Sequence, residues 1–180
     1  MTVQPITHRR TQVFIRNENG ATAVEFALIA APFIALLVGI IQTFLVFFAG
    51  QHLQTIVTQT SRLILTGQAQ DQGLSQSAFA QKLCANVVVL FTCGNIMIDV
   101  QAYSSFSAAN TGAPTLTYNG SGQVTNTWQY NPGSPGQIVV VRAMYQWPVF
   151  FGPLGFNLSN LSNGDRLIMA SAVFKNEPYK

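Results

Sequence analysis

The stretch that decides the fold lies at residues 26–50, FALIAAPFIALLVGIIQTFLVFFAG, and is apolar almost throughout. As a helix, it would be about 37 Å long, enough to cross a hydrocarbon core of about 30 Å. A chain of 180 residues cannot enclose a helix of this length that is apolar on every side. The sequence therefore predicts a membrane span at about 26–50, and not the buried core helix of a soluble protein.

Charged residues are scarce along the whole chain. They make up 8% of the sequence, whereas an ordinary soluble domain has about a quarter. With 48% hydrophobic residues, this composition excludes a disordered chain and disfavours a cytosolic domain with a charged surface. The net charge of +3 is small and lacks the clustered basic residues that nucleic-acid binding requires. We therefore expect no nucleic-acid partner.

The segment before the apolar stretch is basic. It holds Arg9, Arg10 and Arg16 against one acid, Glu18, and so carries +2 of the net charge. The positive-inside rule places this end in the cytoplasm and the residues after about 52 outside. A cleavable secretory signal would have a shorter apolar region ending in small residues, and the only candidate end, at 47–49, is Phe-Phe-Ala. The span is expected to remain in the mature protein.

Glu25 stands at the start of this span. A carboxylate there costs on the order of 1 to 3 kcal/mol, depending on its depth. One interpretation places it in the first helical turn at the interface, where the helix dipole favours an acid. The other depends on its neighbours, because Glu25 is the fifth residue after Gly20 and directly precedes Phe26.

At these residues the chain resembles the type IV prepilin class of secreted subunits. The resemblance implies that a prepilin peptidase on the cytoplasmic face cuts between Gly20 and Ala21, which makes Glu25 the fifth residue of the mature chain. The new amino group and this carboxylate would then pair between adjacent subunits, which makes their removal from water tolerable. Phe26 would begin the apolar helix of the packed filament.

The sequence after the span predicts a small α+β head on the long N-terminal helix, which is a pilin-like arrangement. Apolar spacing continues the first helix to about residue 66, and a second helix is expected at 75–90. Three strands are expected, at 95–106, 137–147 and 166–174. The domains are a basic leader at 1–20, the long helix at 21–66 and the periplasmic head at 67–180.

Two loops separate the predicted strands. Residues 107–136 are rich in Gly, Ser, Asn, Thr and Pro, with a short hairpin expected near Asn119. Residues 148–164 include Phe150, Phe151 and Phe156. This second loop is too apolar for a free linker, so we expect it to pack on the sheet, on the membrane face or on a neighbouring subunit.

Cys84 and Cys93 are the only cysteines. Outside the cytoplasm an isolated pair is expected to be oxidised. A straight helix would hold them about 13.5 Å apart, whereas a disulfide needs Cα atoms within about 7 Å. If they are bonded, the helix must stop before Cys93 and the chain must fold back. Metal-binding and redox roles are disfavoured because C-x8-C is not the spacing of either.

The second half of the chain narrows the resemblance to TadE-like pseudopilins of the tight-adherence (Flp) type IVb pilus system, with the sister TadF-like family as the alternative. The residues that carry it are the two cysteines, Val100-Gln101-Ala102-Tyr103, Tyr145-x-Trp147-Pro148 and the ending at 174–179, FKNEPY. The resemblance implies a minor or assembly-associated pilus component of the bacterial inner membrane. Its partners would be the prepilin peptidase, other pilin subunits and the Tad secretion machinery.

No catalytic set is evident in the sequence. A Ser-His-Asp or Cys-His arrangement would have to use His52, at the membrane edge, and no metal ligand set or cofactor motif is present. Asp99 and Arg142 are placed to pair across the sheet. We therefore expect no enzyme, no cofactor and no metal site. Two hypotheses stand beside the pilus one: a signal-anchored periplasmic binding module unrelated to pili, and a membrane-anchored enzyme.

Overall fold

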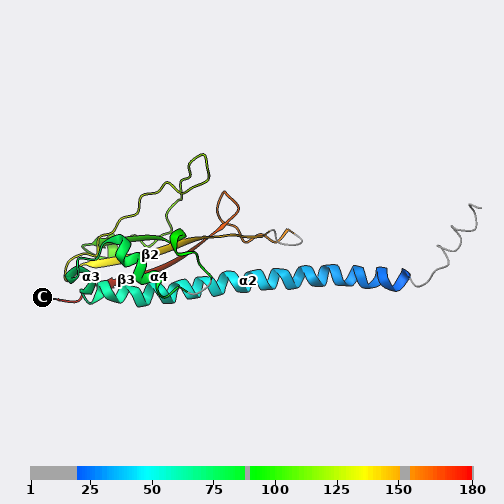
Figure 1. The fold of residues 1–180 in the computed structure, drawn as a ribbon, viewed down its shortest axis with the longest axis horizontal. Helices are drawn as coiled ribbons and strands as arrows, with labels where there is room; N and C mark the ends of the chain where they lie inside the picture. The colour runs from blue at the N-terminus through cyan, green and yellow to red at the C-terminus, as the bar shows by residue number, and fades with distance from the viewer. Residues whose placement is uncertain (1–19, 88–89, 151–154, 180) are drawn as a thin grey trace, which may run out of the picture.

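The computed structural model describes residues 20–87, 90–150 and 155–179. One helix dominates it: α2, Ala21–Leu65, runs for 45 residues without interruption. Figure 1 shows that the rest of the fold gathers around the second half of α2, while the first half extends alone. The prediction of an α+β fold with a long N-terminal helix and a small head is confirmed.

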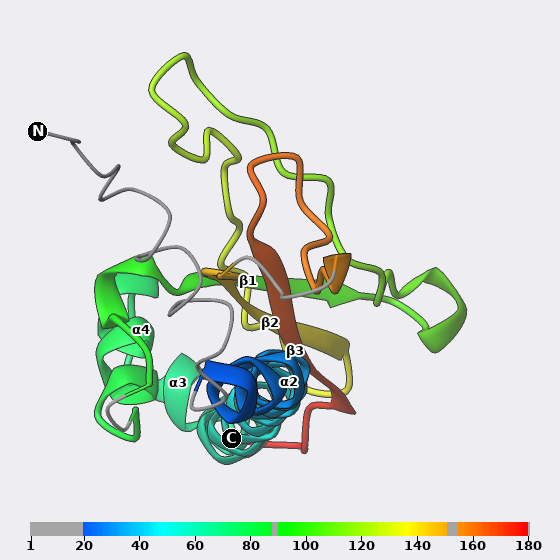
Figure 2. The same cartoon turned by 90° about the vertical axis from the view of Figure 1, so that its right-hand side faces the viewer.

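The head contains a three-stranded antiparallel sheet in the order β1-β2-β3. Its strands are β1, Met97–Tyr103, β2, Ile138–Trp147, and β3, Arg166–Lys175. Each lies within about two residues of its predicted start, because alternation marks β1 and a continuous apolar run marks the buried β2. In the view along the helix, the sheet lies across one side of α2, with the shorter helices beside it (Figure 2).

The core forms where the sheet meets the second half of α2. One face of the helix and one face of β2 supply most of it, with contributions from β1, β3 and α4. Its fully buried members include Ala49, Leu53, Ile56, Val57, Ile64, Phe79, Leu83, Val100, Val139, Val141 and Ala143. The head is therefore built on the helix, since five of the 17 residues of this core cluster belong to α2.

The second helix is shorter than the sequence predicts. The α4 helix, Gln76–Cys84, begins after the Ser75 side chain accepts a hydrogen bond from the backbone N–H of Ala78. It ends six residues before the expected end at residue 90. The chain turns after Cys84 because that residue is joined to Cys93, as described below. A short helix α3, Gln68–Asp71, connects α2 to this region.

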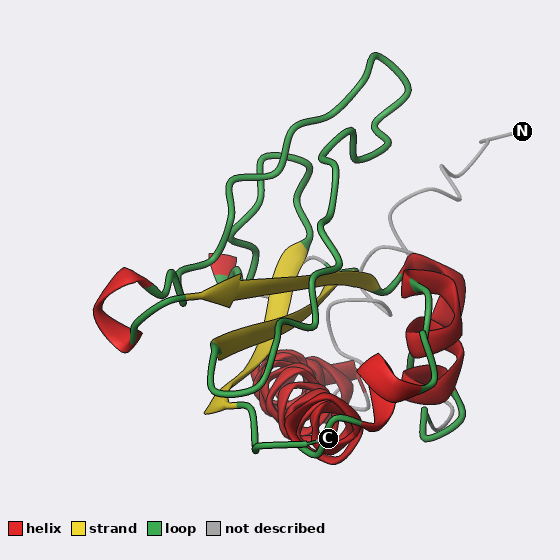
Figure 3. Ribbon diagram, turned by 90° about the vertical axis from the view of Figure 1, so that its left-hand side faces the viewer, coloured by secondary structure: helices red, strands yellow, loops and turns green. Residues whose placement is uncertain are grey.

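The long loop between β1 and β2 covers the outer face of the sheet. Figure 3 shows it rising from the sheet on the side opposite α2. The expected hairpin is present, since Tyr118 and Val124 form an antiparallel bridge around Asn119. Residues 129–131 run beside β1 and bond both backbone groups of Val100, which covers an edge that would otherwise be free to pair.

The opposite edge of the sheet is held by a side chain of the helix. The Gln54 amide donates to the Ser171 carbonyl oxygen at 2.9 Å and accepts from the Ser171 backbone N–H at 3.2 Å. A helix side chain thus takes the place of a neighbouring strand at this position of β3. The two hydrogen bonds hold Ser171 of the sheet beside Gln54 of α2.

Candidate processing and assembly site

The predicted cleavage point coincides with the start of α2. Gly20 is the N-cap residue, with φ −81° and ψ −24°, and Ala21 is the first helical residue. Cutting between them would release a chain that begins as a helix, with its amino group at the helix end. The basic leader at 1–19 lies outside the described residues.

The fold itself gives no reason for glycine at position 20. A Cβ added there would meet nothing within 4 Å. The backbone angle of −81° is one that any L-residue adopts. By contrast, Gly67 has φ +79° and would collide with the ring of Tyr179. A requirement for glycine at position 20 would therefore come from something other than folding.

Glu25 lies on the exposed surface of α2, one turn beyond Ala21. It is the fifth residue of the helix, and the first turn of α2 holds no acidic residue. This weakens the interpretation of Glu25 as a first-turn acid favoured by the helix dipole, an effect that fades within that turn. Residues four apart share a helix face, so the Ala21 and Glu25 positions face the same side. Within the described part of the chain, no salt bridge involves Glu25.

The first half of α2 is uncovered. Phe26 is 74% exposed and Ile29 72% exposed, and the most apolar 18-residue window of the helix has no buried residue. A core helix of a soluble protein would be mostly buried in this window. By length and composition α2 can cross a membrane, and its bare apolar surface indicates a membrane anchor.

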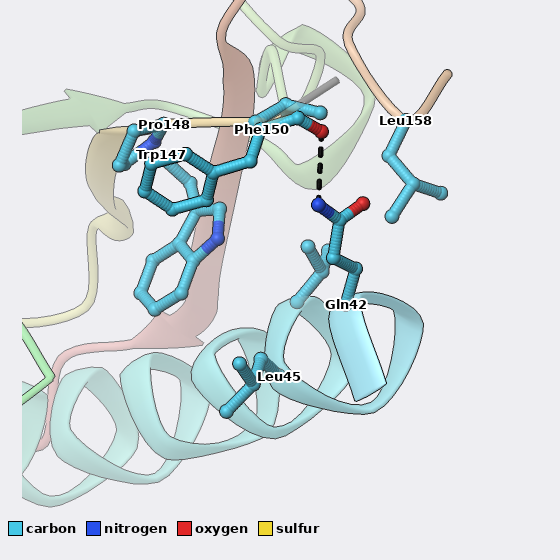
Figure 4. A pocket seen from close by; sticks show the side chains of 8 residues that line it. Gln42, Leu45, Trp147, Pro148, Phe150 and Leu158 are labelled. Atoms are coloured by element: carbon cyan, nitrogen blue, oxygen red, sulfur yellow. Dashed lines mark hydrogen bonds between the residues drawn. The ribbon is translucent and has the colours of Figure 1, made fainter. Parts of the chain in front are cut away.

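The described part of the head meets α2 from about Gly39, beside Phe156, and is hydrogen-bonded to it at Gln42. The Gln42 side-chain amide donates to the Phe150 carbonyl oxygen at 2.9 Å, as Figure 4 shows. A small apolar pocket opens here between the helix and the end of β2, lined by Leu45, Val46, Trp147 and Leu158 among others. The contact marks the boundary between the bare and the covered halves of the helix.

The two cysteines are joined in the structure. Cys84, the last residue of α4, forms a disulfide with Cys93, with the Cα atoms 5.7 Å apart. Cys93 begins a 3-10 turn that leads directly into β1. The bridge therefore fastens the end of α4 to the start of the sheet, and the described residues include no free cysteine.

The expected pair of Asp99 and Arg142 is confirmed. The carboxylate and guanidinium meet at 2.5 Å, and both side chains are buried. The other carboxylate oxygen accepts the backbone N–H of Gln129, and Arg142 also donates to the Gly112 carbonyl oxygen. A buried pair is tolerable when hydrogen bonds satisfy its remaining groups. Here those bonds hold two parts of the long loop against the sheet.

The residues near the C-terminus contact the C-terminal end of α2. The Glu177 backbone N–H donates to the Leu65 carbonyl oxygen at 2.9 Å, one of the helix-end carbonyls that otherwise lack a partner. The Tyr179 hydroxyl donates to the Gly133 carbonyl oxygen. Burial, followed by the charge of Asp71, raises the pKa of the Tyr179 hydroxyl. No local sequence pattern predicts this role of the ending.

The described residues contain no group of three or more His, Cys, Asp or Glu that could hold a metal ion. The ring of His52 stacks on Phe91, with centroids 6.2 Å apart.

The family comparison matches this helix. Residues 20–62 match the TadE-like protein family. The match begins at Gly20, the N-cap of α2, and ends three residues before the helix does. It includes Glu25 and the whole bare half but none of the sheet. No curated protein and no solved structure matches the chain.

The TadE-like family implies a protein associated with the Tad pilus. The family match thus lies on the helix, and it contains four of the predicted site residues: Gly20, Ala21, Glu25 and Phe26. The structure presents all four at the exposed end of α2. The disulfide lies outside the matched segment, in the head.

Proposed function

We propose that the chain is a pseudopilin that takes part in assembly of the tight-adherence pilus, with its leader removed after Gly20 by a prepilin peptidase. The observation that carries the proposal is the coincidence of three boundaries at one residue. The TadE-like match, the helix and the predicted mature chain all begin at Gly20 or its neighbour Ala21.

The open space around Gly20 supports the processing step. Because a side chain at position 20 would meet nothing within 4 Å, the fold would accept other residues there. A peptidase that reads the residue before the cut supplies a reason for glycine that folding does not. The site also lies at the end of the helix, away from every contact of the head.

Glu25 supports the assembly step. Its carboxylate lies on the bare, apolar part of α2, where the described residues provide no salt bridge. In the proposed filament it pairs with the amino group of Ala21 on an adjacent subunit, which lowers the cost of taking both charges out of water. Phe26 and the apolar residues after it pack against neighbouring helices.

The proposed location is the bacterial inner membrane, with the N-terminus in the cytoplasm and the head in the periplasm. The basic leader and the positive-inside rule support this orientation, and a disulfide suits an oxidising compartment. The proposed partners are the prepilin peptidase, other pilin or pseudopilin subunits and the Tad secretion machinery.

Coexpression with a prepilin peptidase tests the proposal. The mature protein should lose residues 1–20, as read from the intact mass, while the protein expressed alone keeps them. An intact N-terminus in the presence of an active peptidase would contradict the pilus role and favour a signal-anchored binding module.

Two glycine variants make the experiment specific. Gly20→Leu should fold and enter the membrane normally, since nothing crowds that position, yet remain unprocessed. The matched control is Gly73→Asn, because Gly73 has φ +58° in open space and asparagine tolerates that conformation. This control should be processed as the wild type is.

A further inference from the structure

The loop between β2 and β3 lies against a part of α2 that belongs to the expected span. Phe156 lies over Gly39, where an added Cβ would be 3.9 Å from the phenylalanine ring. Phe150 meets Gln42 through the hydrogen bond already described. In Figure 1 the described part of this loop, in orange, reaches along α2 beyond the end of the sheet toward the bare half.

The length of the helix gives the depth of these contacts. A hydrocarbon core of about 30 Å takes about 20 helical residues, so a span that begins at Phe26 ends near Leu45. At a rise of about 1.5 Å per residue, Gln42 then lies about 5 Å inside the boundary and Gly39 about 9 Å inside. The loop residues that contact them lie at the same depth.

The first part of the loop has a composition that suits that depth, because residues 148–156 are apolar or glycine throughout. Residues 148–164 contain no charged residue, and the next charges along the chain are Asp165 and Arg166. Phe150 is 73% exposed and Phe156 44% exposed, so both present apolar surface that the head does not cover. With Gly39 and Phe44 of α2, Phe156 lines an open apolar groove along the helix.

One polar group of the loop backbone has a partner on the helix. Irregular backbone at membrane depth needs partners for its polar groups, because lipid tails supply none. The Phe150 carbonyl oxygen has such a partner in the Gln42 side chain. Trp147, at the end of β2 and lining the pocket beside Val46, lies near the boundary, the level at which tryptophan is enriched in membrane proteins.

We infer that Phe150 and Phe156 insert into the outer leaflet of the membrane that α2 crosses, so that the head rests on the lipid surface. The partner is the lipid itself: its acyl chains cover the two rings and the groove beside Phe156. The insertion fixes the head at one height and one orientation on the bilayer. The inference depends on α2 spanning the membrane, but it does not depend on processing or on a pilus.

Spin labels in the full-length protein test this inference. Because both cysteines are in the disulfide, single cysteines introduced at Phe156 and, separately, at Phe150 can be labelled with a nitroxide. The protein is reconstituted in vesicles of phosphatidylethanolamine and phosphatidylglycerol. Collisions of each label with oxygen, which concentrates in the bilayer, are compared with collisions with a water-soluble nickel chelate.

Two reference positions calibrate the reading. Phe33→Cys lies in the bare half, 57% exposed. Phe106→Cys is a matched exposed phenylalanine, 61% exposed, just after the end of β1 that pairs with the start of β2. That end of the sheet is the one remote from Trp147 and the proposed membrane contact.

The labels at Phe156 and Phe150 should favour oxygen over the chelate, as the label at Phe33 does, and the label at Phe106 should show the reverse ratio. A ratio like that of Phe106 would place the loop in water and overturn the inference. Low collision rates with both reagents would also overturn it, because another protein chain would then cover the loop. If the Phe33 label itself read as water-exposed, the span would be wrong and the insertion would fall with it.

Discussion

The two halves of α2 have the same secondary structure but opposite surfaces. In the first half apolar residues face every direction, and Phe26, Ile29 and Leu36 are all more than half exposed. In the second half Leu53 and Val57 are fully buried against the sheet, while Gln51 and Gln59 face outward. One continuous helix is thus built for two environments.

The difference shows what each half depends on. The second half gains its stability from packing, since its apolar face is matched by the valines of β2. Most of the first half packs on no other described part of the chain, so its apolar surface needs lipid or neighbouring subunits. A change in one half should therefore leave the other intact, and the predictions below test this independence.

Aspartate substitutions should separate the two halves most strongly. Leu53→Asp places a carboxylate at a position that is 0% exposed. An uncompensated buried charge costs about 3–5 kcal/mol, and the lost leucine burial adds about 2 kcal/mol. We expect the head to unfold, as measured by near-UV circular dichroism and urea titration in detergent.

The matched control is Leu36→Asp, at a position that is 60% exposed. It should leave the unfolding curve of the head unchanged but lower membrane insertion, with a cost of about 3 kcal/mol at the centre of a span. Equal damage to the head by both variants would contradict the division of α2 into two halves.

Breaking the ion pair should have the next largest effect. Asp99→Ala leaves the Arg142 guanidinium buried without its carboxylate, and removing one partner of a buried pair costs about 3–5 kcal/mol. The free energy of unfolding of the head should fall by that amount. Asp71→Ala, which removes an exposed acid, is the control and should change it little. Membrane insertion should be normal in both variants.

Removing the disulfide should have a smaller effect. The double variant Cys84→Ser, Cys93→Ser opens a short loop, which on the chain-entropy model lowers the unfolding free energy by about 2–3 kcal/mol. Reducing the wild type should lower its urea midpoint to that of the variant, and the same reductant should not shift the variant. If the reductant leaves the wild-type midpoint unchanged, the two cysteines do not stabilise the head through a bridge.

Glu25→Ala should have the smallest effect on stability and still abolish function. Glu25 is exposed and remote from the head, so the unfolding free energy should change by no more than about 0.5 kcal/mol. Pili should nevertheless be absent in cells that carry the variant, as seen by electron microscopy. Glu25→Gln keeps the shape and removes the charge, so it should fail in the same way. Normal piliation of Glu25→Gln would show that the charge is not used.

The sequence predicts the helix and the strands well because their signals are local. An apolar run of this length has one interpretation, and the buried face that includes Leu53, Ile56 and Val57 follows from helical spacing. The start of α2 was predictable for the same reason. Gly20, Ala21, Glu25 and Phe26 form a contiguous motif, and the family match contains all of them.

The contacts that join distant segments were not predictable. The end of α4 was missed because Val87 continues the spacing of Phe79 and Leu83, while the bridge between Cys84 and Cys93 requires a turn. The bond between Gln42 and Phe150 joins residues 108 positions apart, and no local pattern encodes it. The loop at 148–164 contacts α2, which is not among the three surfaces expected for it, and Phe151 lies outside the described residues.

The central claim is that the bare half of α2 lies within the membrane and the covered half outside it. Labelling of single cysteines in spheroplasts with a membrane-impermeant maleimide tests it most directly. Gln59→Cys, on the outward face of the covered half, should react in intact spheroplasts. Phe33→Cys should react only after detergent is added. Reaction of Phe33→Cys in intact spheroplasts, or protection of Gln59→Cys until lysis, would contradict the account.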